Sequence, residues 1–302
     1  MRGKRSCANT RDGKRQWAMP DPTILSISSQ VAYGHVGNAA IVPALQALGC
    51  EVLALPTVLL AHHPGHGTPK GRTVPAEEVA ALLEGLEQVG ALARARAVLT
   101  GYLGLPGTAS VAADAVARVR RYRPDALYVC DPVIGDGGRV YVREGVEDAI
   151  RERLLPLADV LTPNHFELER LAGRPVTTLD QAVAAARGLV ALGPKIVVVT
   201  TLEHEQASSG QIETLAVSAD AAWIVATPRL ERVPRGSGDL MAALLLGHLA
   251  LGMALPDALA RAASAVYAVL AASVGEPEMR LVAERDRLVH PPFLQIRTFT
   301  RP

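Results

Sequence analysis

The pattern of apolar and polar positions alternates between strand-like and helix-like segments along most of the chain. Short apolar runs predict strands, and longer stretches with apolar residues three or four positions apart predict helices. The predicted strands cover residues 24–27, 51–55, 97–99, 126–130, 196–200, 212–217 and 221–226. The predicted helices cover residues 36–48 and 76–93, a segment between the third and fourth strands, and two stretches that begin near residues 238 and 256.

This order of elements predicts one α/β domain. Repeated strand–helix units build a mostly parallel sheet with helices on both faces. The β-branched run Ile196–Thr200 predicts a buried parallel strand. Residues 212–217 and 221–226 follow one another without a helix, which predicts an antiparallel hairpin at that end of the sheet. We find no internal repeat, linker or domain boundary, so the predicted fold class is α/β, a single three-layer α/β/α domain.

The first residues of the chain differ from the rest. Residues 1–18 contain six basic side chains and one acidic side chain, Asp12, but they lack the apolar stretch that a secretory signal needs. A nucleic-acid-binding arm is one interpretation, and a flexible tail is the one we prefer. Met19 lies just before the first predicted strand. We therefore expect residues 1–22 to be an N-terminal extension that is either disordered or assigned to the protein in error. We expect residues 23–302 to be the folded domain.

The composition narrows the classes of partner. Of the 302 residues, 49% are hydrophobic and 20% are charged, as in ordinary globular proteins. The 31 basic and 30 acidic residues give a net charge of +1, which argues against nucleic acid or a membrane surface as the main partner. The most apolar stretch, residues 240–255, contains His248 and ends at Pro256, so it predicts a buried helix rather than a membrane span. The three cysteines show no disulfide or zinc spacing, which fits the reducing cytoplasm.

Unusual loops follow the predicted strands. In open α/β sheets, ligands bind beyond the carboxyl ends of the strands. Six loops rich in glycine and polar residues are expected there, at residues 28–37, 62–72, 100–107, 131–138, 162–167 and 235–239. The sequence therefore predicts a ligand site at one edge of the sheet.

The most informative loop is Arg-Gly-Ser-Gly-Asp at residues 235–239, which runs directly into an apolar helix. Glycines let backbone N–H groups converge on one point, and a helix start adds free donors with partial positive charge. Gly236, Ser237 and Gly238 are therefore a candidate anion cradle. Asp239 beside them is a candidate base for phosphoryl transfer. The alternative is a simple helix cap, because Gly, Ser and Asp are all favoured at that position.

Two further loops allow both a catalytic and a structural interpretation. Asp131 follows a strand and precedes a Gly-rich stretch, which suits either the waters of a magnesium ion or an ordinary Asp–Pro turn. In the segment Thr-Pro-Asn-His-Phe-Glu at residues 162–167, Glu167 could face metal-bound water and Asn164 a phosphate group. The alternative is a helix start capped by Thr162.

Three histidines, His62, His63 and His66, lie close together in a loop that contains glycine. A metal site is one interpretation, but the spacing is neither a helical pair nor a closed ligand set, so we prefer a mobile flap. The sequence contains neither a GxxxxGK[ST] phosphate loop nor a GxGxxG stretch after a strand. P-loop kinases and Rossmann dehydrogenases are therefore disfavoured.

Several of these segments, in this order, resemble the pyridoxal kinases of the ribokinase superfamily. The family's motifs "SxVxYGHxGN", "GYLG", "CDPV", "TPNxxE" and "GxGD" are similar to residues 29–38, 101–104, 130–133, 162–167 and 236–239. The resemblance extends from about residue 23 to residue 290. It implies the ribokinase-like version of the α/β/α fold.

The resemblance also implies an activity, which is the ATP-dependent phosphorylation of the 5′-hydroxymethyl group of pyridoxal. It implies that Asp239 is the general base and that Gly236, Ser237 and Gly238 form the anion hole. The implied substrate-binding residues are Ser29, Val36, Val58, His63, Pro64, Gly65, Tyr102 and Asp239. The implied ATP-binding residues are Asp131, Thr162, Asn164, Glu167, Thr200, Thr227, Pro228, Arg229 and Leu230.

By the same resemblance, Asp131 and Glu167 are the residues expected to organise Mg²⁺, together with a monovalent cation such as K⁺. The expected partners are ATP and a B6 vitamer, with no nucleic acid and no membrane. The expected assembly is a homodimer in the cytoplasm.

The sequence departs from the family pattern in the flap and beside the anion hole. Pro64, Gly65 and His66 follow His63, where the family usually has Thr, then Gly or Gln, then Tyr. Leu60 replaces a phenylalanine of the pocket. Ser237 stands where many members have Thr or Val, and Arg235 stands where an apolar residue is common and would add charge for a phosphate.

Two other functions stay open at this point. A hydroxymethylpyrimidine kinase would have the same fold, but its Gly-rich "DPSGGAG" turn is absent from this sequence. A non-catalytic protein that binds vitamin B6 is the second alternative, and the intact Asp239 with its glycines argues against it.

The N-terminal extension gives a first testable prediction. Because residues 1–18 carry no core pattern, a protein that begins at Met19 should keep its melting temperature and its activity. Thermal unfolding and a kinase assay on the full and the shortened chain would check this. A clear drop in either quantity would show that the segment packs on the domain or works in the site.

Overall fold

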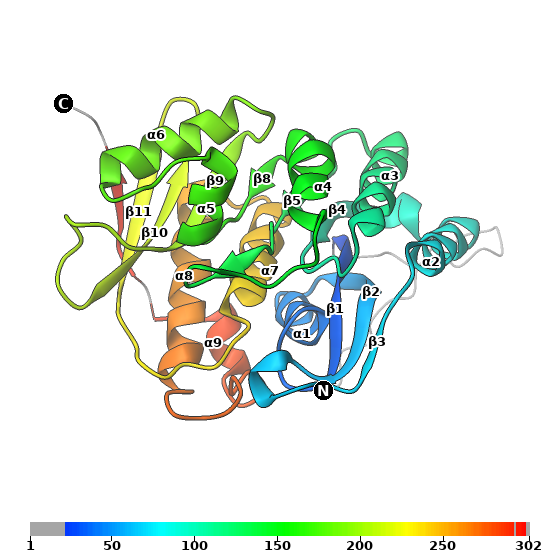
Figure 1. Cartoon of the computed structure of the whole chain (residues 1–302), viewed down its shortest axis with the longest axis horizontal. Coiled ribbons are helices and arrows are strands. Elements are labelled where there is room, and N and C mark those ends of the chain that lie inside the picture. The colour runs from blue at the N-terminus through cyan, green and yellow to red at the C-terminus, as the bar shows by residue number, and fades with distance from the viewer. Residues whose placement is uncertain (1–21, 293, 300–302) are drawn as a thin grey trace, which may run out of the picture.

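The centre of the fold is a run of parallel strands. They are β1 (Thr23–Tyr33), β2 (Glu51–His62), β4 (Ala95–Thr100), β5 (Leu127–Cys130), β8 (Val160–Leu161) and β9 (Ile196–Leu202). The computed structural model describes residues 22–292 and 294–299, and within these the strands belong to a ten-stranded sheet of order β12-β11-β10-β9-β8-β5-β4-β1-β2-β3. Figure 1 shows this sheet crossing the molecule. The predicted mostly parallel sheet is confirmed.

Antiparallel strands close both ends of the sheet. At one end β3 (Gly71–Thr73) pairs with β2, and at the other β10 (Gln211–Val217), β11 (Ala222–Pro228) and β12 (Ile296–Phe299) follow β9. The predicted hairpin is thus confirmed as β10 and β11. A separate small hairpin of β6 (Gly135–Asp136) and β7 (Arg139–Val140) lies in the loop predicted to be rich in glycine turns.

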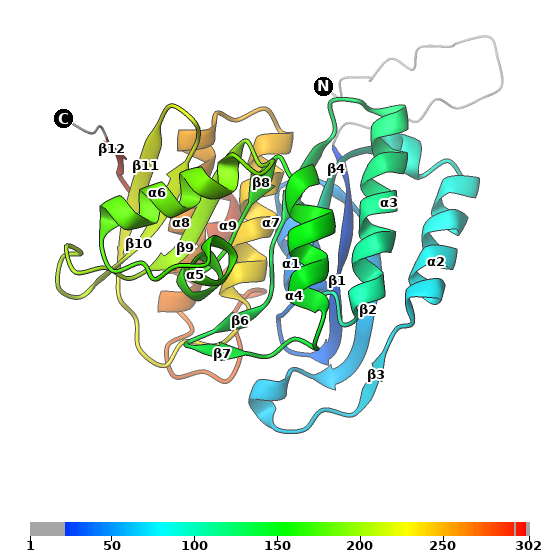
Figure 2. The same cartoon turned by 45° about the horizontal axis from the view of Figure 1, so that its top comes forward.

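Helices cover both faces of the sheet, as Figures 1 and 2 show. One face packs against α1 (Asn38–Ala47), α7 (Ser237–Ala250), α8 (Leu255–Ala271) and α9 (Arg285–Val289). The other packs against α2 (Ala76–Gln88), α3 (Pro106–Tyr122), α4 (Val146–Ala149), α5 (His165–Ala172) and α6 (Leu179–Val190). Neighbouring side chains of β1 alternate between the two cores, with Ile24 in the first and Leu25 in the second. The three-layer α/β/α domain is therefore confirmed.

The apolar helix α7 is buried, as predicted. Its side chains from Leu240 to His248 are shielded from solvent. Burial lowers the pKa of His248 to about 4, so this histidine is neutral at physiological pH. Among the residues that the structure describes, no helix combines the length and the apolar character needed to cross a membrane.

Several predicted boundaries were wrong. β1 and β2 continue to Tyr33 and His62, although residues 28–33 were predicted to form a loop, because the two strands pair with each other beyond the sheet edge. Helix α2 ends at Gln88 instead of residue 93, because Gly90 has a positive φ of 73° and stops it. Residues 1–21 of the predicted extension lie outside the described residues, whereas Pro22 already accepts a hydrogen bond from the N–H of Glu51.

Candidate active site

The loops that follow the parallel strands meet at one edge of the sheet. The N–H of Gly101 donates to the carbonyl of Ile27 at 3.0 Å, which joins the loop after β4 to β1. The N–H of Asp131 donates to Thr100 at 2.9 Å, and the N–H of Thr162 donates to Cys130 at 3.0 Å. Each loop thus begins at the point where the pairing with its neighbouring strand ends. The predicted ligand edge is therefore a continuous row of loop starts.

Asp239 lies in the first turn of α7, at the centre of this row. The helix is preceded by Gly236 with φ 100°, and no side chain caps it. The Asp239 carboxylate instead accepts a hydrogen bond from the N–H of Gly37, the residue that precedes α1. The first N–H groups of α7 have no acceptor within the helix, so they point toward the same space. This geometry differs from a simple helix cap.

Two glycines are required for this arrangement. A side chain at Gly236 would collide with the carbonyl oxygen of His35 and lie 2.8 Å from Cε of Met279. A side chain at Gly37, where φ is 55°, would collide with Ser29. Both residues also have backbone angles that L side chains rarely adopt. Any larger residue would therefore push apart the helix starts that surround Asp239.

The surroundings of Asp239 favour its protonated form. Burial raises its pKa from 3.8 to about 6, and the hydrogen bond from Gly37 opposes part of this rise. The fully buried hydroxyl of Ser28 has no hydrogen-bond partner. It lies beside Gly101 on the side that Asp239 also faces. The carboxyl group is thus poised to exchange a proton near neutral pH.

The predicted acceptor-binding residues surround this point. The β1–β2 register shifts between Ser28 and Gln30, so Ser29 lies in a bulge and is turned toward Gly37. Val58 is buried and lies on β2, and the hydroxyl of the adjacent Thr57 donates to the carbonyl of Tyr102 at 2.5 Å. Tyr102 and Val36 are half-buried. The predicted pocket residues therefore come from two strands, β1 and β2, and from the loops that follow β1 and β4.

Two buried acidic residues, Asp131 and Glu167, lie at the same edge, and Asp131 is close enough to Asp239 to be affected by its charge. Burial and the charge of Glu167 raise the pKa of Asp131 well above its usual range, and Asp239 adds to this rise. Asp131 accepts a hydrogen bond of 3.0 Å from the hydroxyl of Thr162. Burial also raises the pKa of Glu167 to about 7, although three backbone N–H groups donate to it. Acidic groups whose ionisation is disfavoured by burial and by one another are therefore concentrated at this edge.

The segment at residues 162–167 starts a helix, but not where it was predicted. Asn164, not Thr162, caps α5: its side chain accepts from the N–H of Glu167, and Glu167 accepts from the N–H of Asn164. The Asn164 amide also donates to the carbonyl of Gly135 at 2.7 Å. Thr162 does not cap the helix, because its hydroxyl donates its hydrogen bond to Asp131. Both polar groups of Asn164 are thus engaged within the protein.

The other predicted nucleotide residues form two groups. Thr200 lies on β9 beside the acidic residues, where its N–H donates to Pro163 at 2.9 Å. Thr227, Pro228, Arg229 and Leu230 lie at the far end of β11 and beyond it. Arg229 forms an ion pair of 2.8 Å with Glu203, whose N–H donates to the ring of His165 on α5. The second group is joined to the first through the β9–β10 loop and through the pairing of β11 with β10 and of β10 with β9.

The predicted flap is a short turn that contacts a distant part of the chain. Residues 64–66 form one turn of 3-10 helix between β2 and β3. His63 and His66 both approach one carboxylate oxygen, Oε1 of Glu278, at 2.9 and 2.5 Å. Together these three side chains are spaced closely enough to suggest metal ligands. His62 is not in this group, because its ring contacts the carbonyl of His63.

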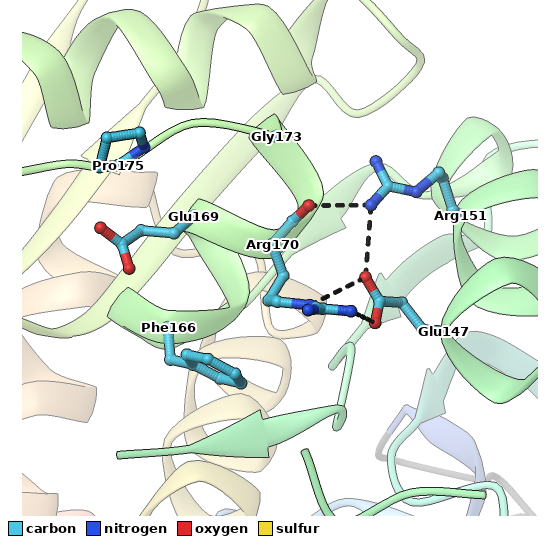
Figure 3. A pocket seen from close by; sticks show the side chains of 7 residues that line it. All are labelled: Glu147, Arg151, Phe166, Glu169, Arg170, Gly173 and Pro175. Carbon is cyan, nitrogen blue, oxygen red and sulfur yellow. Dashed lines mark hydrogen bonds and ion pairs between the residues drawn. The ribbon is translucent and has the colours of Figure 1, made fainter. Parts of the chain in front are cut away.

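A surface hollow of about 450 Å³ lies elsewhere, between α4 and α5 (Figure 3). Its lining contains none of the predicted site residues. Its two arginines are already paired: Arg170 binds Glu147, and Arg151 donates to Glu147 and to two backbone carbonyls. The hollow therefore offers no free cation for a phosphate group.

Sequence reasoning missed three residues of this region: Glu278, Ser28 and Tyr141. Burial, followed by the charges of Glu167 and Asp131, raises the pKa of Tyr141, so its phenol lies close to these acids. Glu278 lies far along the chain in a segment without a recognisable motif. Of the three, only Ser28 could have been found from the sequence, because it directly precedes the motif at residues 29–38.

Comparison with known proteins assigns the chain to a family. A family model described as phosphomethylpyrimidine kinase matches residues 34–279. A pyridoxal kinase of Rubrobacter xylanophilus is 49% identical over 273 residues, which cover 89% of this chain and 94% of that protein. The chain belongs to the pyridoxal kinase family.

Solved structures agree with this family assignment. The pyridoxal kinase of Leishmania donovani in complex with ADP and pyridoxamine is 33% identical to this chain, with a TM-score of 0.88. The match covers 93% of this chain and 100% of that one. A putative phosphomethylpyrimidine kinase of Bacteroides thetaiotaomicron, crystallised with pyridoxal, has a TM-score of 0.85 and 26% identity, with 92% and 100% covered. The ribokinase-like fold and kinase activity follow from these relatives.

In a kinase of this family, replacing Asp239 by Asn tests its role directly. Loss of a general base should reduce kcat at least ~10²-fold and leave the KM for ATP nearly unchanged. Steady-state kinetics on a variant with a normal circular dichroism spectrum would measure both constants. Near-normal turnover would remove the catalytic role from Asp239.

The pH dependence of turnover gives a second prediction from the same residue. Because burial raises the pKa of Asp239 to about 6, its carboxyl group keeps its proton below that pH and cannot accept another. The kcat/KM for the acceptor should therefore fall about tenfold per pH unit below about pH 6, and it should be level above about pH 7. A profile measured at constant ionic strength that stays flat down to about pH 5 would contradict this.

Proposed function

We propose that this protein transfers the γ-phosphoryl group of ATP to the 5′-hydroxymethyl group of pyridoxal, with Asp239 as the base. The main support for this proposal is the position of Asp239. Its carboxylate lies at the start of α7, next to the free N–H groups of the glycine loop, and its pKa is raised to about 6. A base near neutral pKa beside an anion-binding helix start is what phosphoryl transfer to an alcohol requires.

The proposed step uses these groups in a fixed order. The hydroxyl oxygen of the acceptor attacks the γ-phosphorus, the bond from that phosphorus to the ADP oxygen breaks, and the hydroxyl proton passes to Asp239. The N–H groups at residues 236–238 are proposed to donate to the oxygens of the transferred phosphoryl group. Gly238 has open space where a side chain would be, which leaves these donors accessible. Pyridoxal and pyridoxal 5′-phosphate are the substrate and product that fit the family.

The proposed acceptor pocket is formed by Ser29, Val36, Val58 and Tyr102, with His63, Pro64 and Gly65 of the flap. Ser29 offers a hydroxyl beside Gly37, and Val58 offers a buried apolar surface. The combination of an apolar wall with few polar groups suits a small aromatic ring. ATP is assigned to the acidic edge, at Asp131, Thr162, Asn164, Glu167 and Thr200, and to the loop after β11 at residues 227–230.

The acidic edge also fits a divalent cation. Asp131 and Glu167 are buried carboxylates whose pKa values rise partly because each repels its acidic neighbours. Oxygen donors of this kind suit Mg²⁺, which would neutralise charge on the phosphates. Both oxygens of Glu167 already accept backbone N–H groups, so we assign it the water shell of the ion and assign Asp131 the nearer position. A monovalent cation such as K⁺ is proposed on the family resemblance.

We further propose a homodimer in the cytoplasm. The support is the family resemblance for the assembly, and cysteine usage without a disulfide pattern for the compartment. Among the described residues, Cys130 is a buried cysteine that forms no disulfide.

A hydroxymethylpyrimidine kinase is the second candidate, because the matching family model has the description phosphomethylpyrimidine kinase. An assay of ADP release and of phosphorylated product against pyridoxal, pyridoxine, pyridoxamine and hydroxymethylpyrimidine separates the two. We expect kcat/KM for one B6 vitamer to exceed that for the pyrimidine at least ~10-fold, as contacts to a fitted ring would produce. The Asp239→Asn protein is the blank for contaminating kinases.

The opposite preference would identify a hydroxymethylpyrimidine kinase. Binding of a vitamer in calorimetry without any turnover would identify a non-catalytic vitamin B6-binding protein.

A further inference from the structure

The segment after α8 reaches three parts of the site at once. The carboxylate of Glu278 accepts hydrogen bonds from the flap residues His63 and His66 through Oε1, and from the N–H of His35 through Oε2 at 2.9 Å. The next residue, Met279, is buried and places Cε against Gly236. Figures 1 and 2 both show the turn at residues 64–66 beside the segment that follows α8.

This segment is itself fixed by a buried serine. Ser273 lies just beyond the end of α8, and its hydroxyl donates to the carbonyl of Val269 at 2.7 Å. The same hydroxyl accepts the N–H of Arg280 at 2.9 Å. Two residues before Arg280, Glu278 is therefore held in place relative to α8. A carboxylate on a fixed backbone is able to restrain a loop that contacts it.

The carboxylate of Glu278 has little freedom of its own. A side chain at Gly34, where φ is 98°, would lie 2.5 Å from Oε1, so the carboxylate packs directly against this glycine. Only one-tenth of the Glu278 side chain is exposed, and its pKa is lowered by the histidines and by the His35 N–H against the effect of burial. Three donors converge on a carboxylate that is ionised and nearly buried. Such charge-assisted hydrogen bonds are stronger than neutral ones.

The same three side chains also raise the question of a metal ion. Two ligands of a tetrahedral zinc ion lie about 3.3 Å apart, given bonds of about 2.0–2.1 Å. The histidine nitrogens lie closer than this to Oε1 of Glu278, at 2.9 and 2.5 Å, which are hydrogen-bond distances. In addition, Nδ1 of His63 accepts the N–H of Gly65 at 3.0 Å, so the proton of the neutral ring is on Nε2, the atom that would have to bind the metal.

The neighbouring side chain of Arg235 also argues against a metal ion at this place. The guanidinium group of Arg235 is close enough to His63 to lower its pKa, and it lies 3.2 Å from the position of a side chain at Gly65. A metal ion beside this positive charge would be repelled. Arg235 directly precedes Gly236, so this proximity also shows that the flap lies against the anion loop. The geometry therefore favours a hydrogen-bonded latch over a metal site.

We propose that Glu278 is a positioning residue that holds the flap, residues 63–67, against the anion loop by accepting both flap histidines and the His35 N–H. This inference rests on the proposed function for its kinetic consequences. Its role is to keep the flap closed over the acceptor, so that water does not receive the phosphoryl group. Pro64 and Gly65 lack polar side-chain groups, so within the described flap the histidines provide the side-chain contacts that hold it.

The test compares Glu278→Gln with Glu276→Gln, an exposed glutamate two residues earlier in the same segment. The amide at 278 cannot accept three hydrogen bonds in the same geometry, so we expect kcat/KM for pyridoxal to fall ~10-fold. The KM for ATP should stay within about a factor of three, and more ATP should be hydrolysed per phosphorylated product. The Glu276→Gln protein should match the parent in all three quantities.

A double-mutant cycle links this effect to the flap. The His63→Ala, His66→Ala double variant should lose ~10-fold or more in kcat/KM for pyridoxal. Adding Glu278→Gln to it should cost little more, because both flap partners of the carboxylate are already gone and only the His35 N–H still donates to it. Fully multiplicative losses would place Glu278 outside the flap interaction and overturn the proposal. Equal losses for ATP and pyridoxal with a lowered melting temperature would assign it a general folding role and also overturn it.

Two further measurements keep the outcomes separate. Hydrogen exchange of the flap amides needs no substrate, and it should be faster in Glu278→Gln than in Glu276→Gln even if the parent protein does not phosphorylate pyridoxal. A parent protein without turnover would refute the proposed function, and unchanged exchange would refute the latch. Elemental analysis that finds stoichiometric zinc in the parent protein and none in Glu278→Gln would replace the latch with a metal site.

Discussion

The contact between the Asp239 carboxylate and the N–H of Gly37 is the interaction on which the site depends. It joins the starts of α1 and α7, two helices separated by most of the chain. The position is costly: a folded pKa of about 6, above the ordinary 3.8, means that the folded form loses stability as pH rises through that range. At neutral pH this amounts to about 3 kcal/mol, which the two apolar cores must offset. The functional consequence is a carboxylate that can accept a proton near neutral pH.

The parallel sheet explains why other acids gather around Asp239. The carboxyl ends of β5 and β8 are adjacent, so Asp131 and the cap of α5 arrive side by side. The charge of Glu167 is partly balanced by three backbone N–H groups, whereas that of Asp131 is balanced by one hydroxyl. The unbalanced charge is therefore nearest to Asp239. A nucleotide bound with its cation would bring positive charge to that place.

Where the acceptor is proposed to bind, the site is closed by segments whose positions do not follow from the parallel sheet alone. β1 and β2 extend past the sheet edge as a pair and carry the flap on their far end. The segment at residues 278–279 then contacts the flap, the loop at Gly34 and the anion loop. Glycines at these contacts let backbones approach where a Cβ would collide. Chemistry and closure are thus coupled through a few close backbone contacts.

The sequence by itself determined the order of strands and helices, the parallel sheet, the hairpin and the loops that carry Asp131 and Asp239, because periodicity and glycine punctuation are local properties. It did not determine the lengths of β1 and β2, which depend on pairing between strands, nor that Asn164 rather than Thr162 caps α5. It also could not bring Glu278 to His63, since nothing local marks a glutamate more than two hundred residues away as a partner. Only the tertiary structure decided the strand pairing, the contact between Thr162 and Asp131 that leaves the cap of α5 to Asn164, and the contact between Glu278 and His63, because they form between segments whose distance in space bears no relation to their distance along the chain.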